Sequence, residues 1–240
     1  MTKPYKTYPG GKNGNGTYQV LINHVPPHRQ LVIGCAGNCG LFSNMKLSKS
    51  VIINDIDPTV YHQWQLITSI LKADILVSNT DVLNLLIVPY RDWYDQDDVF
   101  IYIDLPYLMD SRKSQQKLYD FEVETEHTRQ VLQECKKFRF AKIMISHYPC
   151  ELYDNELAGW IWHDFKSMTR HGLADERIYM NYPTPTVLHD YSYIGTNFTK
   201  RQTLKRSKTN ILNKLDRLNP LLRNAVLAEI NEHYLKNDII

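Results

Sequence analysis

Short, uninterrupted apolar segments alternate with helix-like segments through the middle of the chain, and this alternation restricts the fold more than any other feature. At residues 30–37 and 50–57 the apolar residues run consecutively, so we predict that these two segments are strands buried on both faces, as in a parallel sheet. The predicted strands span residues 30–37, 50–57, 75–81, 99–104 and 140–146. The predicted helices span residues 41–49, 58–71 and 124–137. This order of strands and helices predicts an α/β fold with a Rossmann-like, doubly wound and mostly parallel sheet.

The end of the chain has a different character. Strand signals stop after about residue 190, so we expect one domain at 1–190 and a small basic helical appendage at 191–240. Residues 198–217 hold seven Lys or Arg residues against one acid. Such one-sided charge suits contact with nucleic-acid phosphates, although a solvated helix face is an equally good interpretation. The candidate contacts in this segment are Lys200, Arg201, Lys205 and Arg206.

Composition argues against a disulfide-stabilised protein, a metal-binding protein and a membrane-spanning protein. The formal net charge is only +2, and four cysteines are too few for a disulfide framework in a chain of 240 residues. Cys35 and Cys39 have a CxxxC spacing without a second ligand pair nearby, so we expect no metal site. No run approaches the roughly 20 apolar residues of a membrane span, and the first residues lack an apolar leader. We therefore expect a cytoplasmic protein.

Polar motifs gather where the predicted strands end, which is where doubly wound sheets bind ligands. Before the first strand, TYPGGK at 7–12 offers paired glycines and the cation of Lys12, which suits a ligand carboxylate. After that strand, CAGNCG at 35–40 forms the glycine turn that adenosine-containing ligands use, with Cys35 and Gly37 as candidate contacts. Each of these motifs alone is weak evidence.

Two further acids follow predicted strands. Asp55, with Ile56 beside it, stands where a carboxylate accepts hydrogen bonds from ribose hydroxyls. The alternative for Asp55 is a helix N-cap, a role that suits Asp57 better because a proline follows it. Asp81 is a candidate partner for the amine of an adenine, and an N-cap is an equally good interpretation there.

The segment VFIYIDLPYL carries the most specific chemistry. A strand ends in Asp104, and Leu105, Pro106 and Tyr107 follow it. Methyl transfer to an aromatic amine is difficult because the nitrogen lone pair is delocalised into the ring. The Asp104 carboxylate and the Leu105 carbonyl can accept the two amine hydrogens, while Tyr107 offers a stacking face for a base flipped out of a duplex. Positioning and electrostatics then dominate the displacement from a sulfonium.

With these motifs in this order, the chain resembles the Dam-like (D12 class) adenine-N6 DNA methyltransferases, especially the short forms of phages and mobile elements. The shared segments are TYPGGK, the glycine loop, NDID, the D-x-P-Y motif, KIMISHYPCELYDNELAGW at 142–160 and MNYPTPTVLHDYSYIGTNF at 180–198. The resemblance covers nearly the whole chain. It implies the S-adenosylmethionine-dependent methyltransferase fold, with S-adenosylmethionine as cofactor. The residues it places against the cofactor are Tyr8, Lys12, Asp55 and Asp104.

The resemblance also implies site-specific methylation of adenine N6 in double-stranded DNA, in a bacterial or phage-infected cell and at its nucleoid. A partner subunit or a restriction nuclease is a further expected partner. Only 22 residues separate Asp81 from Asp104, which leaves no room for a large recognition insertion. We therefore expect target contacts from later segments. The candidates before the basic appendage are 109–121 with Arg112 and Lys113, and 163–177 with Arg170.

The chain departs from the family pattern in places. It has DLPY instead of DPPY, Ile33 in place of an acid, Cys39 in place of the second loop glycine, and His147 in place of a glycine. A positive φ at Cys39 would cost about 1 kcal/mol, unless Gly40 takes over by a shift of one residue. One alternative is therefore a catalytically silent homologue that acts as a DNA-binding or partner subunit. Another is methylation of a different planar amine, in RNA adenine or glutamine.

Overall fold

The structure is a computed structural model that describes residues 11–14, 16–71, 73–108, 121–169 and 172–235. The chain divides into two units, Met1–Tyr191 and Ser192–Ile240. The first contains the sheet and the second contains two helices, α8 and α9. Tyr8, Arg112, Lys113 and Arg170, which the sequence analysis singled out, lie outside the described residues.

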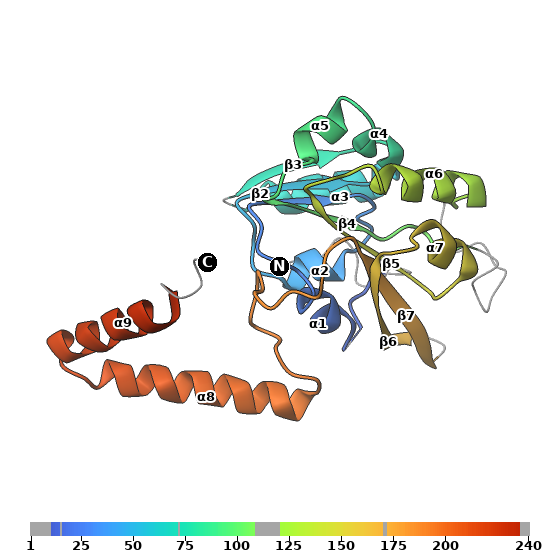
Figure 1. The fold of residues 1–240 in the computed structure, drawn as a ribbon. Helices are drawn as coiled ribbons and strands as arrows, with labels where there is room; N and C mark the ends of the chain where they lie inside the picture. The colour runs from blue at the N-terminus through green and yellow to red at the C-terminus, as the bar shows by residue number, and fades with distance from the viewer. Residues whose placement is uncertain (1–10, 15, 72, 109–120, 170–171, 236–240) are drawn as a thin grey trace. The chain divides into compact units, whose positions relative to one another are not determined.

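Seven strands form one sheet in the first unit, in the order β3-β2-β1-β4-β5-β7-β6 (Figure 1). The strands are β1 (Gln30–Ile33), β2 (Ser50–Asn54), β3 (Asp74–Ser78), β4 (Val99–Ile103), β5 (Lys142–His147), β6 (Ile161–Thr169) and β7 (Gly172–Met180). Strands β1 to β5 are mutually parallel, and β7 is antiparallel to both β5 and β6. The predicted mostly parallel α/β fold is confirmed. The strand order reverses between β1 and β4, where open sheets of this type bind ligands.

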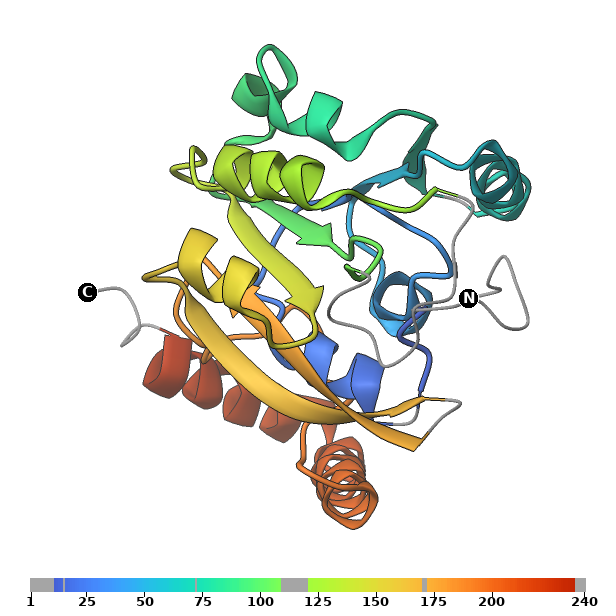
Figure 2. The same cartoon turned by 90° about the vertical axis from the view of Figure 1, so that its right-hand side faces the viewer.

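Helices cover both faces of this sheet. The helices of the first unit are α1 (Thr17–Ile22), α2 (Gly40–Asn44), α3 (Pro58–Thr68), α4 (Val82–Leu86), α5 (Tyr90–Tyr94), α6 (Thr125–Cys135) and α7 (Glu151–Glu156). Helices α4 to α7 pack together on one face, and α1 and α2 pack together on the other (Figures 1 and 2). Helix α3 begins at Pro58 because the preceding Asp57 side chain accepts a hydrogen bond from the Thr59 amide at 2.7 Å.

The central strands carry the core. All five residues of β4 are buried, because α6 and its neighbours cover one face while α1 and α2 cover the other. Side chains of β1, β4 and β5 pack against Val131 and Leu132 of α6. Consecutive apolar residues mark these strands in the sequence for this reason, since both faces of each strand meet other side chains.

The hairpin of β6 and β7 was not predicted. Its residues mix charged and apolar types, and several of its large apolar side chains, including Trp162 and Leu173, are exposed. Strand β7 pairs with β5 only from Arg177 to Met180, so the rest of the hairpin extends beyond the carboxyl end of β5 (Figure 2). Part of β6 lies against α1 there, and Thr17 donates a hydrogen bond to Ser167 at 3.0 Å.

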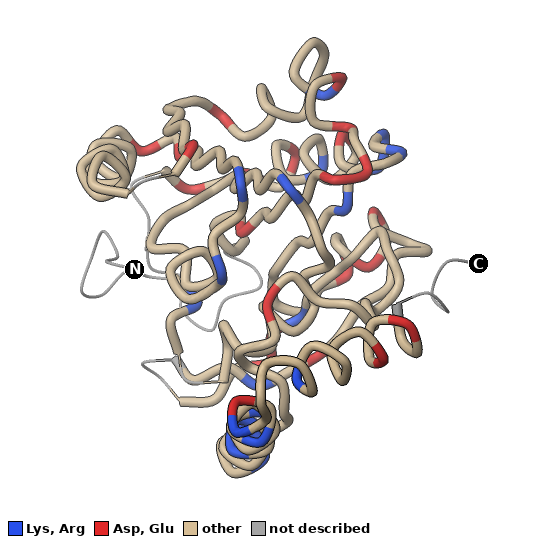
Figure 3. Tube along the Cα trace, turned by 90° about the vertical axis from the view of Figure 1, so that its left-hand side faces the viewer, with Lys and Arg blue, Asp and Glu red and all other residues tan. Residues whose placement is uncertain are grey.

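The second unit is helical, as expected. Helix α8 (Phe198–Asp216) begins where the Asn197 side chain accepts a hydrogen bond from the Lys200 amide, and α9 (Pro220–Leu235) follows it. None of the residues of α8 is buried. Figure 3 shows Lys and Arg positions along α8, which is viewed nearly end-on. In the described part of the chain, every helix is too short or too polar to cross a membrane.

Stacked histidines join the segment before the second unit to the sheet domain. The rings of His28 and His189 lie 4.0 Å apart, and His28 also contacts the Ser48 hydroxyl and the Pro26 carbonyl. Burial, and secondarily His189, lower the pKa of His28 to about 4.

A loss of stability in mild acid is therefore expected. His28 takes up a proton near pH 6.5 in the unfolded chain but only near pH 4 in the folded chain. The free energy of unfolding is therefore highest above about pH 6.5 and decreases as the pH falls from 6.5 to 4. The full effect is at most about 3 kcal/mol. Urea unfolding between pH 4 and 7.5 measures it, and His28→Gln should flatten the curve. An equally steep curve for the variant would contradict the assignment.

Candidate cofactor and catalytic site

A cavity of about 340 Å³ opens at the carboxyl edge of the sheet. Segments that follow β1, β2, β3 and β4 all contribute to its wall, and the start of α6 closes one side. The lining residues are Gly11, residues 34–38, 55–57, 81–82, 104–106 and 121–124, and His127. The volume is in the usual range for a site that binds a small molecule or cofactor.

The wall of this cavity is acidic. Six of its lining residues are carboxylic acids, and Lys and Arg are absent from the described residues that line it. The acids are Asp55, Asp57, Asp81, Asp104, Glu122 and Glu124. A concave surface with this charge favours a cationic ligand and opposes one that carries phosphates.

Asp55 holds the glycine loop in place. Its two carboxylate oxygens accept hydrogen bonds from the backbone amides of Gly37 at 2.7 Å and of Asp57 at 2.9 Å. The Gly37 carbonyl in turn accepts a hydrogen bond from the Trp64 indole at 2.9 Å, and Gly37 has a φ of 45°, which favours glycine. Burial raises the pKa of Asp55. Asp55 thus lines the cavity and also fixes the loop, while Asp57 is the N-cap of α3; the contact of Asp55 with a ribose stays a prediction.

Cys39 does not adopt the left-handed conformation considered for it. Its φ is 10°, outside the left-handed range, and its side chain is 3% exposed in the core, whereas the cavity wall is formed by residues 35–38. Burial raises the pKa of the Cys39 thiol to about 12. The chain turns into α2 at Gly40, one residue earlier than the predicted helix start, so residues 35–38 and not Cys39 face the cavity.

Gly40, the first residue of α2, is where close approach matters. Its amide donates to the Gly11 carbonyl at 2.8 Å, and a Cβ at this position would lie 2.4 Å from the Lys12 carbonyl oxygen. At Gly34, by contrast, the short contacts of an added Cβ would be with side chains, Val82 at 2.7 Å and Ile103 at 3.3 Å, while the nearest backbone atom, the Tyr102 carbonyl oxygen, lies 3.8 Å away. We expect Gly40→Ala to lower the free energy of unfolding by about 1–3 kcal/mol through forced separation of backbones, and Gly34→Ala to have a smaller effect. Chemical denaturation checks both, and the reverse order would contradict this account.

Asp104 joins the cavity to a buried polar cluster. Its Oδ1 accepts hydrogen bonds from the Lys12 ammonium and the Ser146 hydroxyl, each at 2.8 Å, and Ser146 also bonds to the Tyr102 hydroxyl at 2.8 Å. Both of these donors use Oδ1, and no donor to Oδ2 is found among the described residues. Burial raises the pKa of Asp104, and the neighbouring Lys12 opposes this rise. Asp104 lines the cavity, so its Oδ2 can accept a hydrogen bond from a ligand.

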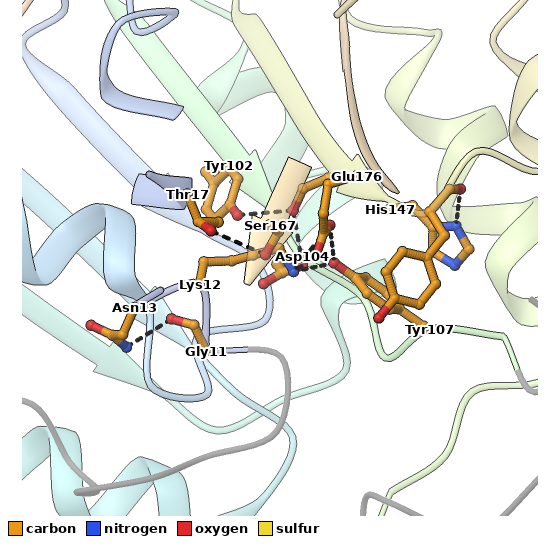
Figure 4. Close-up of polar contacts among 12 residues, drawn as sticks. Gly11, Lys12, Asn13, Thr17, Tyr102, Asp104, Tyr107, His147, Ser167 and Glu176 are labelled. Atoms are coloured by element: carbon orange, nitrogen blue, oxygen red, sulfur yellow. Dashed lines mark hydrogen bonds and ion pairs between the residues drawn. The ribbon is translucent and has the colours of Figure 1, made fainter. Parts of the chain in front are cut away.

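Lys12 lies between the buried carboxylate of Glu176 and the carboxylate of Asp104, whose side chain is 14% exposed (Figure 4). Its ammonium is 2.8 Å from Asp104, 3.9 Å from Glu176 and in hydrogen-bond contact with the Tyr107 hydroxyl, which donates to Glu176 at 2.6 Å. The backbone of Lys12 has a φ of 51°, which a non-glycine residue adopts only when its surroundings hold it there. Lys12, which the sequence predicts as a ligand contact, therefore lies in this cluster and is not one of the described residues that line the cavity.

Tyr107 is also covered by protein in this structure. Its side chain is buried, and its ring lies 4.2 Å from the Tyr148 ring and 4.8 Å from the His147 ring. Leu105 and Pro106 line the cavity, but Tyr107 is not among its described lining residues. His147 accepts a hydrogen bond from the Leu108 amide at 3.3 Å, so it holds the end of this loop.

Glu176 and His127 were missed by the sequence analysis. Glu176 belongs to β7, which was not predicted, and burial raises its pKa. His127 lies in the first turn of α6 and contacts Asp81, which is also the N-cap of α4 through a 2.8 Å bond from the Leu83 amide. The sequence offered one signal for Glu176, a charged residue shortly before the apolar end of β7. It offered no signal for His127.

Comparisons with known proteins concern the fold. No protein-family model and no curated protein matches the sequence. Among solved structures, the chain is similar to the magnesium protoporphyrin IX methyltransferase ChlM from Synechocystis with bound SAM (S-adenosylmethionine), at 10% identity and a TM-score of 0.44 over 70% of this chain and 76% of that one. It is also similar to a SAM-dependent methyltransferase from Agrobacterium tumefaciens, at 10% identity and a TM-score of 0.43 over 69% and 60%.

The chain is also similar to the precorrin 8w decarboxylase from Methanobacterium thermoautotrophicum, at 8% identity and a TM-score of 0.41 over 68% of this chain and 87% of that one. The sheet order and the cavity define the class of the first unit. It is a doubly wound α/β domain with an acidic cavity at the carboxyl edge of the sheet.

Proposed function

We propose that the chain is an S-adenosylmethionine-dependent methyltransferase that methylates N6 of adenine in double-stranded DNA. The observation that carries the proposal is the environment of Asp104. One carboxylate oxygen is held by Lys12 and Ser146, and the other has no donor among the described residues, at the wall of a cavity that Leu105 and Pro106 also line. This is an acceptor arrangement for the amine of a planar base.

The cavity fits the cofactor by charge and by extent. S-adenosylmethionine carries a net positive charge at neutral pH, and six carboxylic acids line the cavity. The wall crosses four adjacent strands, which lie about 4.8 Å apart, so it spans roughly 14 Å. The cofactor, when bound, supplies a methyl group activated on a sulfonium. The residues that would hold its adenosine part are Gly37, Asp55, Ile56 and Asp81.

The chain's own residues would act by positioning. Oδ2 of Asp104 and the carbonyl of Leu105 accept the two amine hydrogens, which localises the nitrogen lone pair toward the methyl donor. Lys12 and Ser146 keep Asp104 in place through Oδ1. The raised pKa of Asp104 suits it to hold the proton that the nitrogen releases once the new bond has formed. In this proposal, stacking on Tyr107 requires that its ring leave the cover of Tyr148.

Double-stranded DNA is proposed as substrate on two grounds. The order of motifs resembles DNA adenine methyltransferases, and exposed residues of α8, including Lys200, Lys205 and Arg206, offer positive charge for phosphates. Binding through phosphates should weaken steeply as salt rises. The guanidinium of Arg201 instead donates a hydrogen bond within the second unit, to the Gly195 carbonyl at 3.3 Å.

Transfer of a radiolabelled methyl group to mixed-sequence duplex DNA tests the proposal, with Asp104→Ala as the control. Label that appears in N6-methyladenine only with the unmodified protein supports it. Equal label in both samples, or none in either, overturns it. Parallel incubations with RNA and with a glutamine-containing peptide separate these acceptors from DNA.

A second candidate is a DNA-binding or partner subunit without catalytic activity. The enclosure of Lys12 and Tyr107 in the buried cluster favours it, because neither residue then meets a ligand. Calorimetric titration with S-adenosylmethionine separates the two candidates. A dissociation constant in the micromolar range removes the silent subunit, and the absence of binding removes the enzyme.

A further inference from the structure

Asp81 and Asp104 stand at opposite ends of the cavity wall. Asp81 follows β3 and Asp104 follows β4, and β2 and β1 lie between these strands. If methyl transfer takes place at Asp104, the purine of the cofactor extends toward Asp81. The inference below rests on the proposed function in this respect.

His127 contacts both oxygens of the Asp81 carboxylate. Its Nε2 lies 2.9 Å from Oδ1 and 2.8 Å from Oδ2, so this nitrogen must carry the hydrogen that is donated. The Nδ1 atom is buried and has no hydrogen-bond partner among the described residues. Among the described residues, the imidazole ring therefore makes its hydrogen bonds with Asp81 alone. His127 is also part of the cavity wall.

The donors around Asp81 leave little of its carboxylate unused. Oδ1 accepts from the Leu83 amide at 2.8 Å as well as from His127, so both of its acceptor directions are taken. Oδ2 accepts from His127 and keeps one direction for another donor. The Asp81 side chain is about one-third exposed, at 33%, so a ligand in the cavity can reach that direction.

We propose that His127 is a positioning residue that makes the cavity selective for a 6-aminopurine over a 6-oxopurine. By holding Asp81 at both oxygens, His127 presents one fixed acceptor to the base. A purine amine satisfies that acceptor with an N–H. A 6-oxo group places an oxygen against the remaining acceptor direction of Oδ2, and a site built to accept an N–H discriminates against a ligand that offers an acceptor there.

Two ligands that differ at this edge of the purine test the proposal, S-adenosylhomocysteine and S-inosylhomocysteine; the second has an oxygen in place of the amine and a hydrogen on N1. Each is titrated by calorimetry into the full chain and into two variants, His127→Leu and His127→Gln. Glutamine carries an N–H at about the reach of the histidine Nε2, and leucine has none. Both residues are good helix formers, so α6 should tolerate either one, and thermal unfolding checks this.

We expect the unmodified protein to bind the adenosyl ligand at least tenfold more tightly than the inosyl ligand. His127→Leu should reduce this ratio to threefold or less, mainly by weakening the adenosyl ligand, and His127→Gln should retain most of it. A merely structural role for His127 would weaken both ligands alike and leave the ratio unchanged, and that result would overturn the proposal.

The outcomes also separate this proposal from the proposed function. Equal binding of both ligands by the unmodified protein would refute the role of His127 and leave the methyltransferase intact. Binding of neither ligand would refute both. An unchanged ratio in His127→Leu, with tight adenosyl binding in the unmodified protein, would refute the role of His127 alone.

Discussion

Replacing Asp104 by asparagine is expected to lower the rate constant of methyl transfer about 100- to 1,000-fold, with little change in cofactor affinity. Lys12 and Ser146 are both donors and both contact Oδ1, so the asparagine carbonyl will turn toward them. The amide NH2 then replaces Oδ2 at the cavity wall and faces the amine of the base, donor against donor. The acceptor arrangement is lost although the shape of the side chain is preserved.

Single-turnover kinetics with labelled cofactor measure this effect, and calorimetry reports the cofactor dissociation constant separately. Asp175→Asn is the control, because it removes one carboxylate from an exposed position of β7 that pairs with Lys166. It should retain the activity of the unmodified protein. A rate constant for Asp104→Asn within tenfold of the unmodified value would refute the role given to Oδ2.

Replacing Lys12 by methionine is expected to have the largest effect on stability. It leaves Asp104 and Glu176 buried near each other without their cation, and breaking a buried ion pair in this way lowers the free energy of unfolding by about 3–5 kcal/mol. The pKa values of both carboxyl groups, already raised by burial, should rise further. Methyl transfer should be lost at neutral pH as well.

The loss should depend on pH in a defined direction. A carboxyl group whose pKa is higher in the folded chain than in the unfolded chain binds its proton preferentially in the folded state, so the penalty shrinks as pH falls and the groups become neutral. Urea unfolding of Lys12→Met at pH 5 and pH 8 measures the difference.

A second variant tests the cause of the Lys12 effect. Adding Glu176→Gln to Lys12→Met removes one of the two uncompensated carboxylates and should restore part of the lost stability, as a non-additive double mutant. A penalty below 1 kcal/mol for Lys12→Met, or a double variant less stable than Lys12→Met, would contradict the ion-pair account.

The location of the cavity could be predicted because it depends on local features. Asp55, Asp81 and Asp104 each follow an apolar segment, and parallel strands bring their carboxyl ends to one edge, so three residues far apart in sequence line one cavity. The glycine loop was predicted at the right place. The geometry of Cys39 was not, because one residue decides where α2 begins and a pattern does not locate a helix start that closely.

The partners of these residues could not be predicted. Glu176 meets Lys12 only because β7 runs antiparallel beside β5 and extends past its end, and no local pattern announces a pairing between segments some 30 residues apart. His127 meets Asp81 because α6 packs against α4. Both contacts depend on how whole elements lie against each other.

By itself the sequence determined the class of fold, the parallel central strands and the edge of the sheet at which the cavity opens, since burial on both faces leaves consecutive apolar residues in the central strands. Only the tertiary structure decided which charges are paired. Lys12 is enclosed with Asp104 and Glu176, while Oδ2 of Asp104 stays at the cavity wall. The reason is physical: apolar burial is recorded locally in residue type and spacing, whereas a hydrogen bond between side chains depends on distance and direction in three dimensions.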